Sequence, residues 1–502
     1  MLRLLFLNTG SNLVVMVVKL AITFIMTPIF VSYLGRYDYG IWEMLAAIIG
    51  YMGLLDLGIK PAISRFAAKY HAEKDGVALS SVYSSAMAFM AAVGFVLFLF
   101  FSCWAVFFPE VLAEDSSNFE RYSILLLVIG IQLGIIFPGY VAESYLEGFQ
   151  KYYLKNNITI FNSVVGATFI YFCITPDNGL ILLAGVNAFG MSVKYLVFIF
   201  LLSRRSYGAI RPKLSDFSWE RLKGILSFGF KSFVQGVATR LEYATDTLVI
   251  GFFLGPAMVP LYGIPANLVQ YIRTIGYTLT HAFMPFFSHL SALDEKERII
   301  RIYFAASRYV IGIMLPMSVG ACIIGGPFIG IWLGGDFTQN SDAIILLLVL
   351  FSAVPFLNPF SSRYLTAIGK HGIFAKLTPI SAVINFAASV ALVQEYGIIG
   401  AALGSVIPVF VFFPIYLRYT CRNLGITVSS YVYKSILPCL LPTLIMAAVV
   451  LVFRFQVGLN SYGQIVLSVV IGALVYAVMF SVLALTKEER NYVVSKFFKI
   501  NG

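Results

Sequence analysis

Residues 80–108 read SSVYSSAMAFMAAVGFVLFLFFSCWAVFF, an apolar stretch without Asp, Glu, Lys or Arg. A helix that spans a bilayer needs about 20 mainly apolar residues, so this stretch predicts a transmembrane helix. Working outward with the same window gives fourteen such segments in the chain, which predict an all-α polytopic membrane protein. The segments are 9–31, 38–60, 80–108, 122–145, 154–174, 179–202, 225–253, 257–288, 302–332, 341–362, 373–393, 397–417, 433–453 and 463–485.

The composition agrees with a protein that is solvated by lipid. Apolar residues make up 59% and charged residues 12% of the 502 residues, against about 45–50% and about 25% in soluble domains. This balance excludes a cytosolic enzyme, a nucleic-acid-binding module and a secreted disulfide scaffold. The five cysteines and four histidines have no ligand spacing, so we expect no metal site.

The distribution of basic residues predicts the orientation of the chain. With the N-terminus in the cytoplasm, 26 of the 35 Lys and Arg residues fall on the cytoplasmic side, three fall outside and six lie within spans. Cytoplasmic loops carry an excess of Lys and Arg. Both termini are therefore expected in the cytoplasm.

An internal duplication organises the spans. Three pairs of short anchors recur in the same order at displacements of 218–220 residues. The pairs are Tyr33-Leu34-Gly35 with Phe253-Leu254-Gly255, Tyr145-Leu146 with Tyr364-Leu365, and Gly179-Leu180 with Gly397-Ile398. Each copy holds an even number of spans, so we expect an axis along the membrane normal to relate the two. The predicted organisation is a six-helix lobe at 1–202, a cytoplasmic connector at 203–224, a second six-helix lobe at 225–417, two additional transmembrane helices at 433–485 and a cytoplasmic amphipathic tail at 486–502.

Several ionisable residues lie within the spans, where each costs about 2.5–3.5 kcal/mol on insertion scales and usually faces a cavity or a partner. Lys19, Arg240 and Arg273 lie near the middle of their spans, and the first two are 221 residues apart. We expect these cations, with Lys231, to line a cationic cavity between the lobes. The candidates for ion coupling or for pairing within the cavity are Glu43, Asp56, Glu242 and Asp246.

Structural roles are the alternative for these charges. Arg240 and Asp246 could pair with charges on neighbouring helices, and residues near span ends, such as Lys231, can extend to the interface. The same alternative applies to Glu43 and Asp56. Three further charged residues are expected to be interfacial or structural: Glu143, Lys194 and Arg308.

The start of the second lobe carries a resemblance to a known family. Residues 226–233, 240–255 and 262–268 read LSFGFKSF, RLEYATDTLVIGFFLG and YGIPANL, and the first lobe agrees with GLLDLG at 53–58. These stretches, with IWLG at 331–334, resemble the polysaccharide transporters. These are the Wzx-type lipid-linked oligosaccharide flippases of the MOP (multidrug/oligosaccharidyl-lipid/polysaccharide) superfamily.

The resemblance implies a V-shaped, alternating-access exporter without its own ATPase. Such a flippase moves undecaprenyl-diphosphate-linked oligosaccharide repeat units to the outer leaflet of the bacterial inner membrane, for O-antigen, capsule or exopolysaccharide assembly. The implied partners are this lipid-linked oligosaccharide, membrane lipids and a polymerase or chain-length regulator of the same pathway, with no nucleic acid. The resemblance implies function as a monomer.

The residues are compatible with this chemistry. A diphosphate carries about two negative charges and needs cations at mid-membrane depth, and Lys19, Arg240 and Arg273 supply them. Sugar hydroxyls would find hydrogen-bonding partners in Asn267, Gln270 and Tyr271. We expect no cofactor, apart from a coupled H⁺ or Na⁺ ion held by one of the acidic candidates.

Two other functions compete with this one. A cation-coupled multidrug exporter of the same superfamily would favour an acidic, aromatic cavity, whereas the central charges here are mostly basic. A membrane glycan polymerase, the enzyme alternative, typically needs a sizeable extracytoplasmic loop, and the outer loops of this chain are short. The sequence therefore predicts a transporter and not an enzyme.

Overall fold

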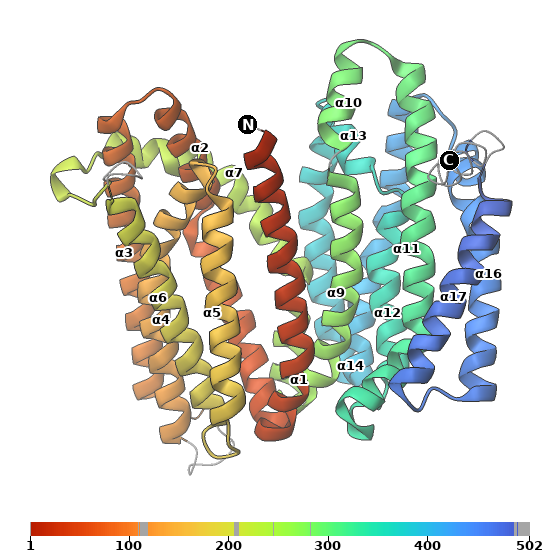
Figure 1. Ribbon diagram of the computed structural model, residues 1–502, viewed down its shortest axis with the longest axis horizontal. Helices are drawn as coiled ribbons and strands as arrows, with labels where there is room; N and C mark the ends of the chain where they lie inside the picture. The colour runs from red at the N-terminus through yellow and green to blue at the C-terminus, as the bar shows by residue number, and fades with distance from the viewer. Residues whose placement is uncertain are drawn as a thin grey trace, which may run out of the picture. The chain divides into compact units, whose positions relative to one another are not determined.

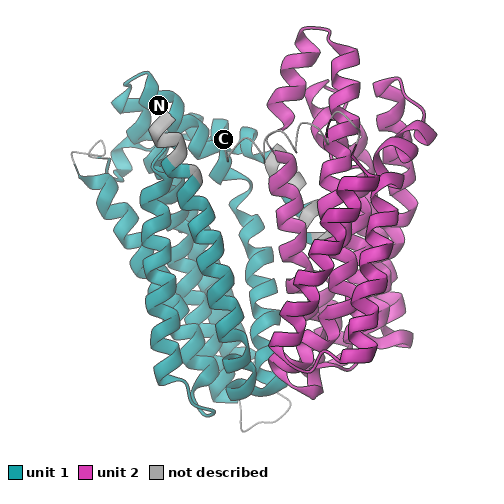
Figure 2. Ribbon diagram, turned by 45° about the vertical axis from the view of Figure 1, so that its right-hand side comes forward, with its two compact units in different colours: residues 1–240 teal, residues 241–502 magenta. Residues whose placement is uncertain are grey.

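The computed structural model describes residues 2–108, 110, 119–204, 210–243, 245–281, 283–485 and 489. Within these ranges all regular structure is helical and no strand occurs. The chain forms two compact units, Met1–Arg240 and Leu241–Gly502, which Figure 2 colours separately. The boundary falls within the seventh predicted span. The predicted tail at 486–502 lies outside the described residues, apart from Glu489.

The first unit consists of long helices that run side by side (Figure 1). Its helices are α1 (Leu2–Met52), η1 (Gly53–Asp56), α2 (Ile59–Ala72), α3 (Gly76–Phe107), α4 (Phe119–Gly148), α5 (Tyr152–Cys173), α6 (Gly179–Ser203), η5 (Leu214–Asp216) and most of α7 (Trp219–Tyr243). The connector packs on α3, because Ser84 Oγ accepts from the Lys213 N–H at 3.0 Å and Ser85 Oγ accepts from the Ser218 N–H at 2.8 Å.

The second unit holds the remaining helices. They are α8 (Thr245–Leu254), η6 (Pro256–Met258), α9 (Val259–His281), α10 (Phe283–Ala292), α11 (Lys296–Leu333), η7 (Gly335–Phe337), α12 (Ser341–Ala353), η8 (Val354–Leu357), α13 (Ser361–Ala367), α14 (Gly372–Leu424), α15 (Val428–Tyr431), η9 (Val432–Ile436), α16 (Leu437–Val452), η10 (Phe453–Val457) and α17 (Tyr462–Leu483). Buried aromatic side chains, among them Phe287, Tyr303 and Phe360, form its largest apolar cluster.

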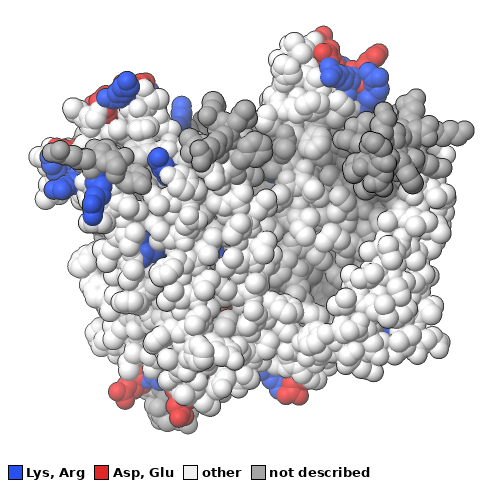
Figure 3. All heavy atoms as spheres, viewed as in Figure 1, with Lys and Arg blue, Asp and Glu red and all other residues white. Residues whose placement is uncertain are grey.

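All fourteen predicted spans fall on helices, which confirms an all-α polytopic membrane protein. In the described part of the chain, nine helical segments are long and apolar enough to cross a membrane on their own. Two of them, α1 and α14, each cover two predicted spans. The three predicted spans that fall outside the nine lie on α5, α7–α8 and α9–α10. In each unit, the charged side chains visible in Figure 3 gather mainly at the helix ends.

Glycine backbone conformations support the predicted duplication. Gly35 has φ 70° and ψ 177°, and its partner at the repeat displacement, Gly255, has φ 89° and ψ 159°. This region of φ is accessible mainly to glycine. The break at Gly35 divides α1 between the first two predicted spans, and a break at Gly397 (φ 58°) likewise divides α14.

Helix α7 is held against the start of α2 by direct backbone contact. A Cβ atom on Gly58, whose φ is +71°, would lie 2.2 Å from the carbonyl oxygen of Gly229. Two glycines therefore allow the helices to approach more closely than any side chain would permit. This contact places α7, which carries Arg240, within the first unit.

Candidate functional site

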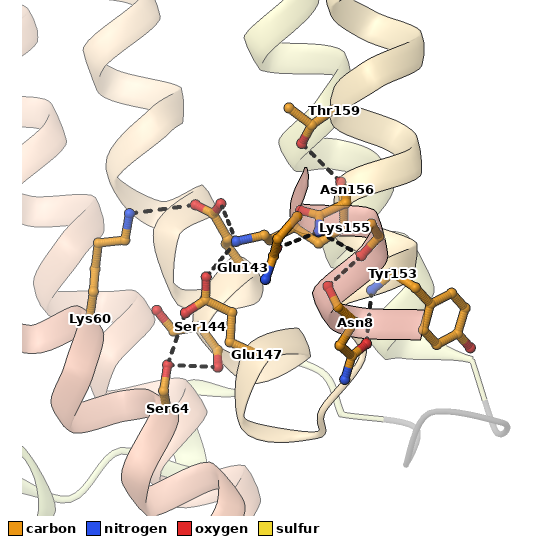
Figure 4. Close-up of polar contacts among 12 residues, drawn as sticks. Asn8, Lys60, Ser64, Glu143, Ser144, Glu147, Tyr153, Lys155, Asn156 and Thr159 are labelled. Atoms are coloured by element: carbon orange, nitrogen blue, oxygen red, sulfur yellow. Dashed lines mark hydrogen bonds and ion pairs between the residues drawn. The ribbon is translucent and has the colours of Figure 1, made fainter. Parts of the chain in front are cut away.

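The first unit brings five charged side chains together at one end of its helices. Lys60 comes from α2, Glu143 and Glu147 from α4, Lys155 from α5 and Lys194 from α6. We call these five residues the lysine–glutamate centre. Figure 4 shows four of them, with Lys60 and Lys155 on opposite sides of Glu143.

The distances in this centre separate one close ion pair from two loose ones. Lys155 Nζ lies 2.6 Å from Glu147 Oε1 but 3.7 Å from Glu143 Oε1, and Lys60 Nζ lies 3.5 Å from Glu143 Oε2. Charge-assisted N–H···O bonds are usually about 2.7–2.9 Å long. Glu147 is thus the close partner of Lys155, whereas Glu143 is shared between two lysines.

Helix geometry explains why α4 supplies one face of the centre. Tyr140, Glu143 and Glu147 are three and four residues apart, so they lie on the same side of the helix. Lys60 Nζ lies 3.8 Å from the centre of the Tyr140 ring. The hydroxyl of Tyr195 donates to Glu143 Oε2 at 3.4 Å. The α4 face thus contacts α2 and α6.

Lys194 is the most buried lysine of the centre. Its residue exposure is 7%, and its ammonium lies 4.2 Å from the Tyr195 ring centre. Glu143 attracts it, and Lys19, Lys60 and Lys155 act on it as like charges. Glu143 and Lys194, for which the sequence predicts interfacial or structural roles, both lie in this cluster, which has more cations than carboxylates.

Three of the four cations predicted to line the cavity, Lys19, Lys231 and Arg240, lie in the first unit. Lys19 is exposed on α1, and Arg240 is exposed near the end of α7. The Arg240 guanidinium lies beside Gly50, where a Cβ atom would be 2.9 Å from Nη1. Tyr51 Oη donates to the Arg240 carbonyl at 3.1 Å. These contacts place Arg240 against the second half of α1.

The fourth predicted cation, Arg273, lies in the second unit and is buried, with 8% of its surface exposed. Its guanidinium donates to Gln270 Oε1, and it lies beside Ser318 and Ser352 between α9, α11 and α12. Gln270 thus interacts with Arg273 in this structure. Of the other two predicted sugar contacts, Asn267 is exposed and Tyr271 is half-buried on α9.

Further charged candidates lie on α7, on α1 and at the turn before α2. Lys231 and Glu242 belong to α7, but their side chains lie outside the described part of the structure. Glu43 lies in α1 with its Oε2 buried and without a hydrogen-bond partner. Asp56 Oδ1 accepts from the Gly58 N–H at 2.7 Å, which stabilises the turn between η1 and α2.

Asp246 is the centre of a buried polar site in the second unit. Its carboxylate accepts from Ser389 Oγ at 3.0 Å, from Ser405 Oγ at 2.6 Å and from the Tyr262 hydroxyl. Asn385 Nδ2 donates to Ser405 Oγ at 3.0 Å, and Asn385 Oδ1 is buried without a hydrogen-bond partner. We call these five residues the Asp246 site. They come from α8, α9 and both halves of α14.

The Asp246 site is suited to a small cation or a proton. Among the described residues, no Lys, Arg or His forms an ion pair with Asp246, although its exposure is only 7%. A buried carboxylate without a cationic partner is costly unless its charge is neutralised. At the Gly35–Gly255 displacement the first lobe has Met26, also buried. The duplicated chain thus has a carboxylate at this position in one lobe only.

An apolar pocket of about 540 Å³ lies in the second unit between α9, α11, α16 and α17. Its lining includes Leu268, Ile313, Met317, Phe328, Val450 and Tyr476. A pocket of this composition accepts hydrocarbon rather than sugar or phosphate. The two additional helices, which lie outside the duplication, form one of its walls.

Comparison with known proteins places the chain among membrane transporters. Residues 5–291 match the model of a family described as polysaccharide biosynthesis protein. A putative O-antigen transporter of Shigella flexneri is 24% identical over 385 residues, which cover 74% of this chain and 86% of that protein. A probable low-salt glycan biosynthesis flippase of Haloferax volcanii, Agl15, is 25% identical over 270 residues. That match covers 53% of this chain and 56% of Agl15, so it spans just over half the length of that relative.

A solved structure shares the fold. The lipid II flippase MurJ in an inward closed conformation superposes with a TM-score of 0.74 and 16% identity, over 95% of this chain and 98% of that chain. At this identity the likeness concerns the fold alone. It supports the all-helical architecture that the hydropathy pattern predicted.

Proposed function

Because the chain belongs to the polysaccharide biosynthesis protein family, we propose that it is a flippase for lipid-linked oligosaccharides. The observation that carries the proposal is the family match over residues 5–291, which includes the whole first unit apart from its first four residues. Its relatives include proteins named as a putative O-antigen transporter and a probable low-salt glycan biosynthesis flippase. The chain acts as a transporter and not as an enzyme.

The charges of the first unit support a substrate with a diphosphate headgroup. Lys19, Arg240, Lys231 and Arg273 are each proposed to bind phosphate, which cannot cross hydrocarbon without cations. Lysine binds phosphate as a point charge, and arginine can also form a bidentate contact. An organic cation, the substrate of the rival multidrug exporter, would be repelled by the same residues.

The other parts of the substrate have matching surfaces. Asn267, Gln270 and Tyr271 on α9 are proposed sugar contacts. The apolar pocket beside α16 and α17 fits part of a polyprenyl chain. The described residues therefore include candidate contacts for the phosphates, the sugars and the lipid chain of the substrate.

Asp246 is proposed as the site of a coupled H⁺ or Na⁺ ion, since its three hydroxyl partners and the Asn385 amide provide oxygen ligands. Outward movement of a diphosphate is itself favoured by about 2.3 kcal/mol per charge per 100 mV when the cytoplasm is negative. The ion would then drive the return of the empty protein. Glu43 and Glu242 remain further candidates, whereas the contact of Asp56 with Gly58 suits a structural role.

The cellular setting is also part of the proposal. The chain is expected in the bacterial cytoplasmic membrane with both termini inside, and its two lobes, 1–202 and 225–417, would alternate access to the two leaflets. The oligosaccharide would enter O-antigen, capsule or exopolysaccharide assembly. A polymerase or chain-length regulator would act next, and the flippase would work as a monomer.

Deletion of the gene provides the cellular test of this function. We expect the lipid-linked oligosaccharide to accumulate in the inner leaflet and the surface glycan to disappear, with restoration by a plasmid copy. Protease-free spheroplasts labelled with a sugar-specific lectin would measure the outer-leaflet fraction. Normal surface glycan in the deletion strain, together with lost resistance to cationic drugs, would favour the multidrug exporter instead.

A further inference from the structure

Glu143 lies where an anion can be held by lysines from several helices. Lys60 of α2 and Lys155 of α5 contact its two oxygens, and Lys194 of α6 lies within electrostatic reach. Its side chain is 14% exposed, against 31% for Lys60. The carboxylate thus occupies a largely enclosed position among cations, with one of them open to a surface.

The contacts of Glu143 are loose enough to be exchanged. Its two lysine distances, 3.5 and 3.7 Å, are about 1 Å longer than the 2.6 Å contact between Lys155 and Glu147. Lys155 has a close contact with Glu147, and an incoming anion would have to compete with that contact. Lys60 and Lys194 have no contact of this length with Glu143, so an incoming anion can bind them in its place.

We propose that the lysine–glutamate centre is a second phosphate position besides Lys19, Arg240, Lys231 and Arg273, where Glu143 stands in for a phosphate group and keeps Lys60 and Lys194 in place until the diphosphate displaces it. This inference rests on the proposed flippase function. Without substrate the lysine–glutamate centre holds three lysines and two glutamates, an excess of one positive charge that attracts the phosphates. When the substrate moves on, Glu143 pairs again with the lysines and competes against rebinding.

This role predicts opposite changes in binding and in transport. Removing the charge with Glu143→Gln leaves the lysines without their internal competitor, so the affinity for a diphosphate should rise by about tenfold, the effect of one close charge interaction in a partly buried site. Export should fall, because release is slowed. A purely structural ion pair predicts weaker binding and a lower melting temperature.

The test uses the full-length protein in nanodiscs and undecaprenyl diphosphate as the probe, with undecaprenol as the uncharged comparison. Glu143→Gln should lower the Kd about tenfold, and Glu143→Asp, which keeps the charge, should remain near wild type. Glu295→Gln, the same change in an exposed pair with Arg298, is the matched control and should leave the Kd unchanged. Lys60→Gln and Lys194→Gln should each raise it.

The outcomes separate this inference from the proposed function. If the wild type binds undecaprenyl diphosphate no better than undecaprenol, the proposed function fails. If the wild type discriminates but Glu143→Gln binds no more tightly, the stand-in role is wrong. If Glu143→Gln fails to fold, the Kd of the double variant Lys60→Gln/Glu143→Gln is compared with the Kd of Lys60→Gln. Only the stand-in role predicts that the double variant binds undecaprenyl diphosphate more tightly than Lys60→Gln does.

Discussion

Replacing Asp246 with Asn is expected to stop coupled export. Asparagine has nearly the same shape, so the site should remain packed, but the charge that attracts an ion is lost. We expect the export rate to fall by at least about tenfold, which corresponds to about 1.4 kcal/mol in the rate-limiting barrier. The measurement is the appearance of lectin-accessible glycan after a pulse of labelled sugar, normalised to the amount of protein in the membrane.

Variants of the serines that donate to Asp246 distinguish Na⁺ coupling from H⁺ coupling. With Na⁺ coupling, Ser389→Ala and Ser405→Ala remove oxygen ligands, so the Na⁺ concentration for half-maximal transport should rise. With H⁺ coupling, the same variants should shift the pH dependence and leave the response to Na⁺ unchanged. Glu295→Gln, at the residue that precedes α11, serves as the control. Normal transport by Asp246→Asn, with an unchanged ion response, would contradict the assignment of this site.

Alanine in place of Lys19, Arg240 or Arg273 is the second change with a large expected effect. Lys19 and Arg240 are exposed, so their truncation should spare the fold while lowering export by about tenfold or more through loss of a charge-assisted phosphate contact. Arg240→Lys should retain more activity than Arg240→Ala, since the point charge remains. Export is measured as the appearance of lectin-accessible glycan, and the amount of protein in the membrane is measured by immunoblot.

Arg273 needs a separate control because it is buried beside Gln270. Gln270→Ala removes the same contact without removing the charge. If both variants lose export equally and both lower the melting temperature, Arg273 stabilises the fold and does not bind phosphate. Arg298→Ala, at an exposed position, controls for a simple change in net charge. Full export by Lys19→Ala and Arg240→Ala would refute the cationic site.

The sequence was most informative about features that depend only on residues close together in the chain. Hydropathy predicts fourteen spans, and eleven of them fall on the nine described segments that are long and apolar enough to cross a membrane, because a span must be apolar whatever its neighbours are. The repeat anchors even marked two glycines, Gly35 and Gly255, that share a positive φ. The unit boundary at Arg240 differs from the predicted connector at 203–224, and α7 contacts the start of α2 through Gly58 and Gly229, which only the packed helices bring together.

The functional residues were harder to predict wherever tertiary contacts create the site. Asp246 was singled out by its charge, but Ser389 and Ser405 look like ordinary helix-packing residues until α14 places them at its carboxylate. The sequence predicts only interfacial or structural roles for Glu143 and Lys194. Only the packing of α2, α4, α5 and α6 shows that they belong to one centre.

Translocation by the purified protein is the most direct measurement of the central claim. Liposomes containing the protein and a fluorescent lipid-linked oligosaccharide are treated with a membrane-impermeant reagent that quenches only the outer leaflet. A flippase should make the inner-leaflet substrate accessible, so that quenching proceeds to completion, and Asp246→Asn should abolish the part that depends on an ion gradient. Quenching that stops at the outer-leaflet fraction, as in liposomes without protein, would contradict the proposed function.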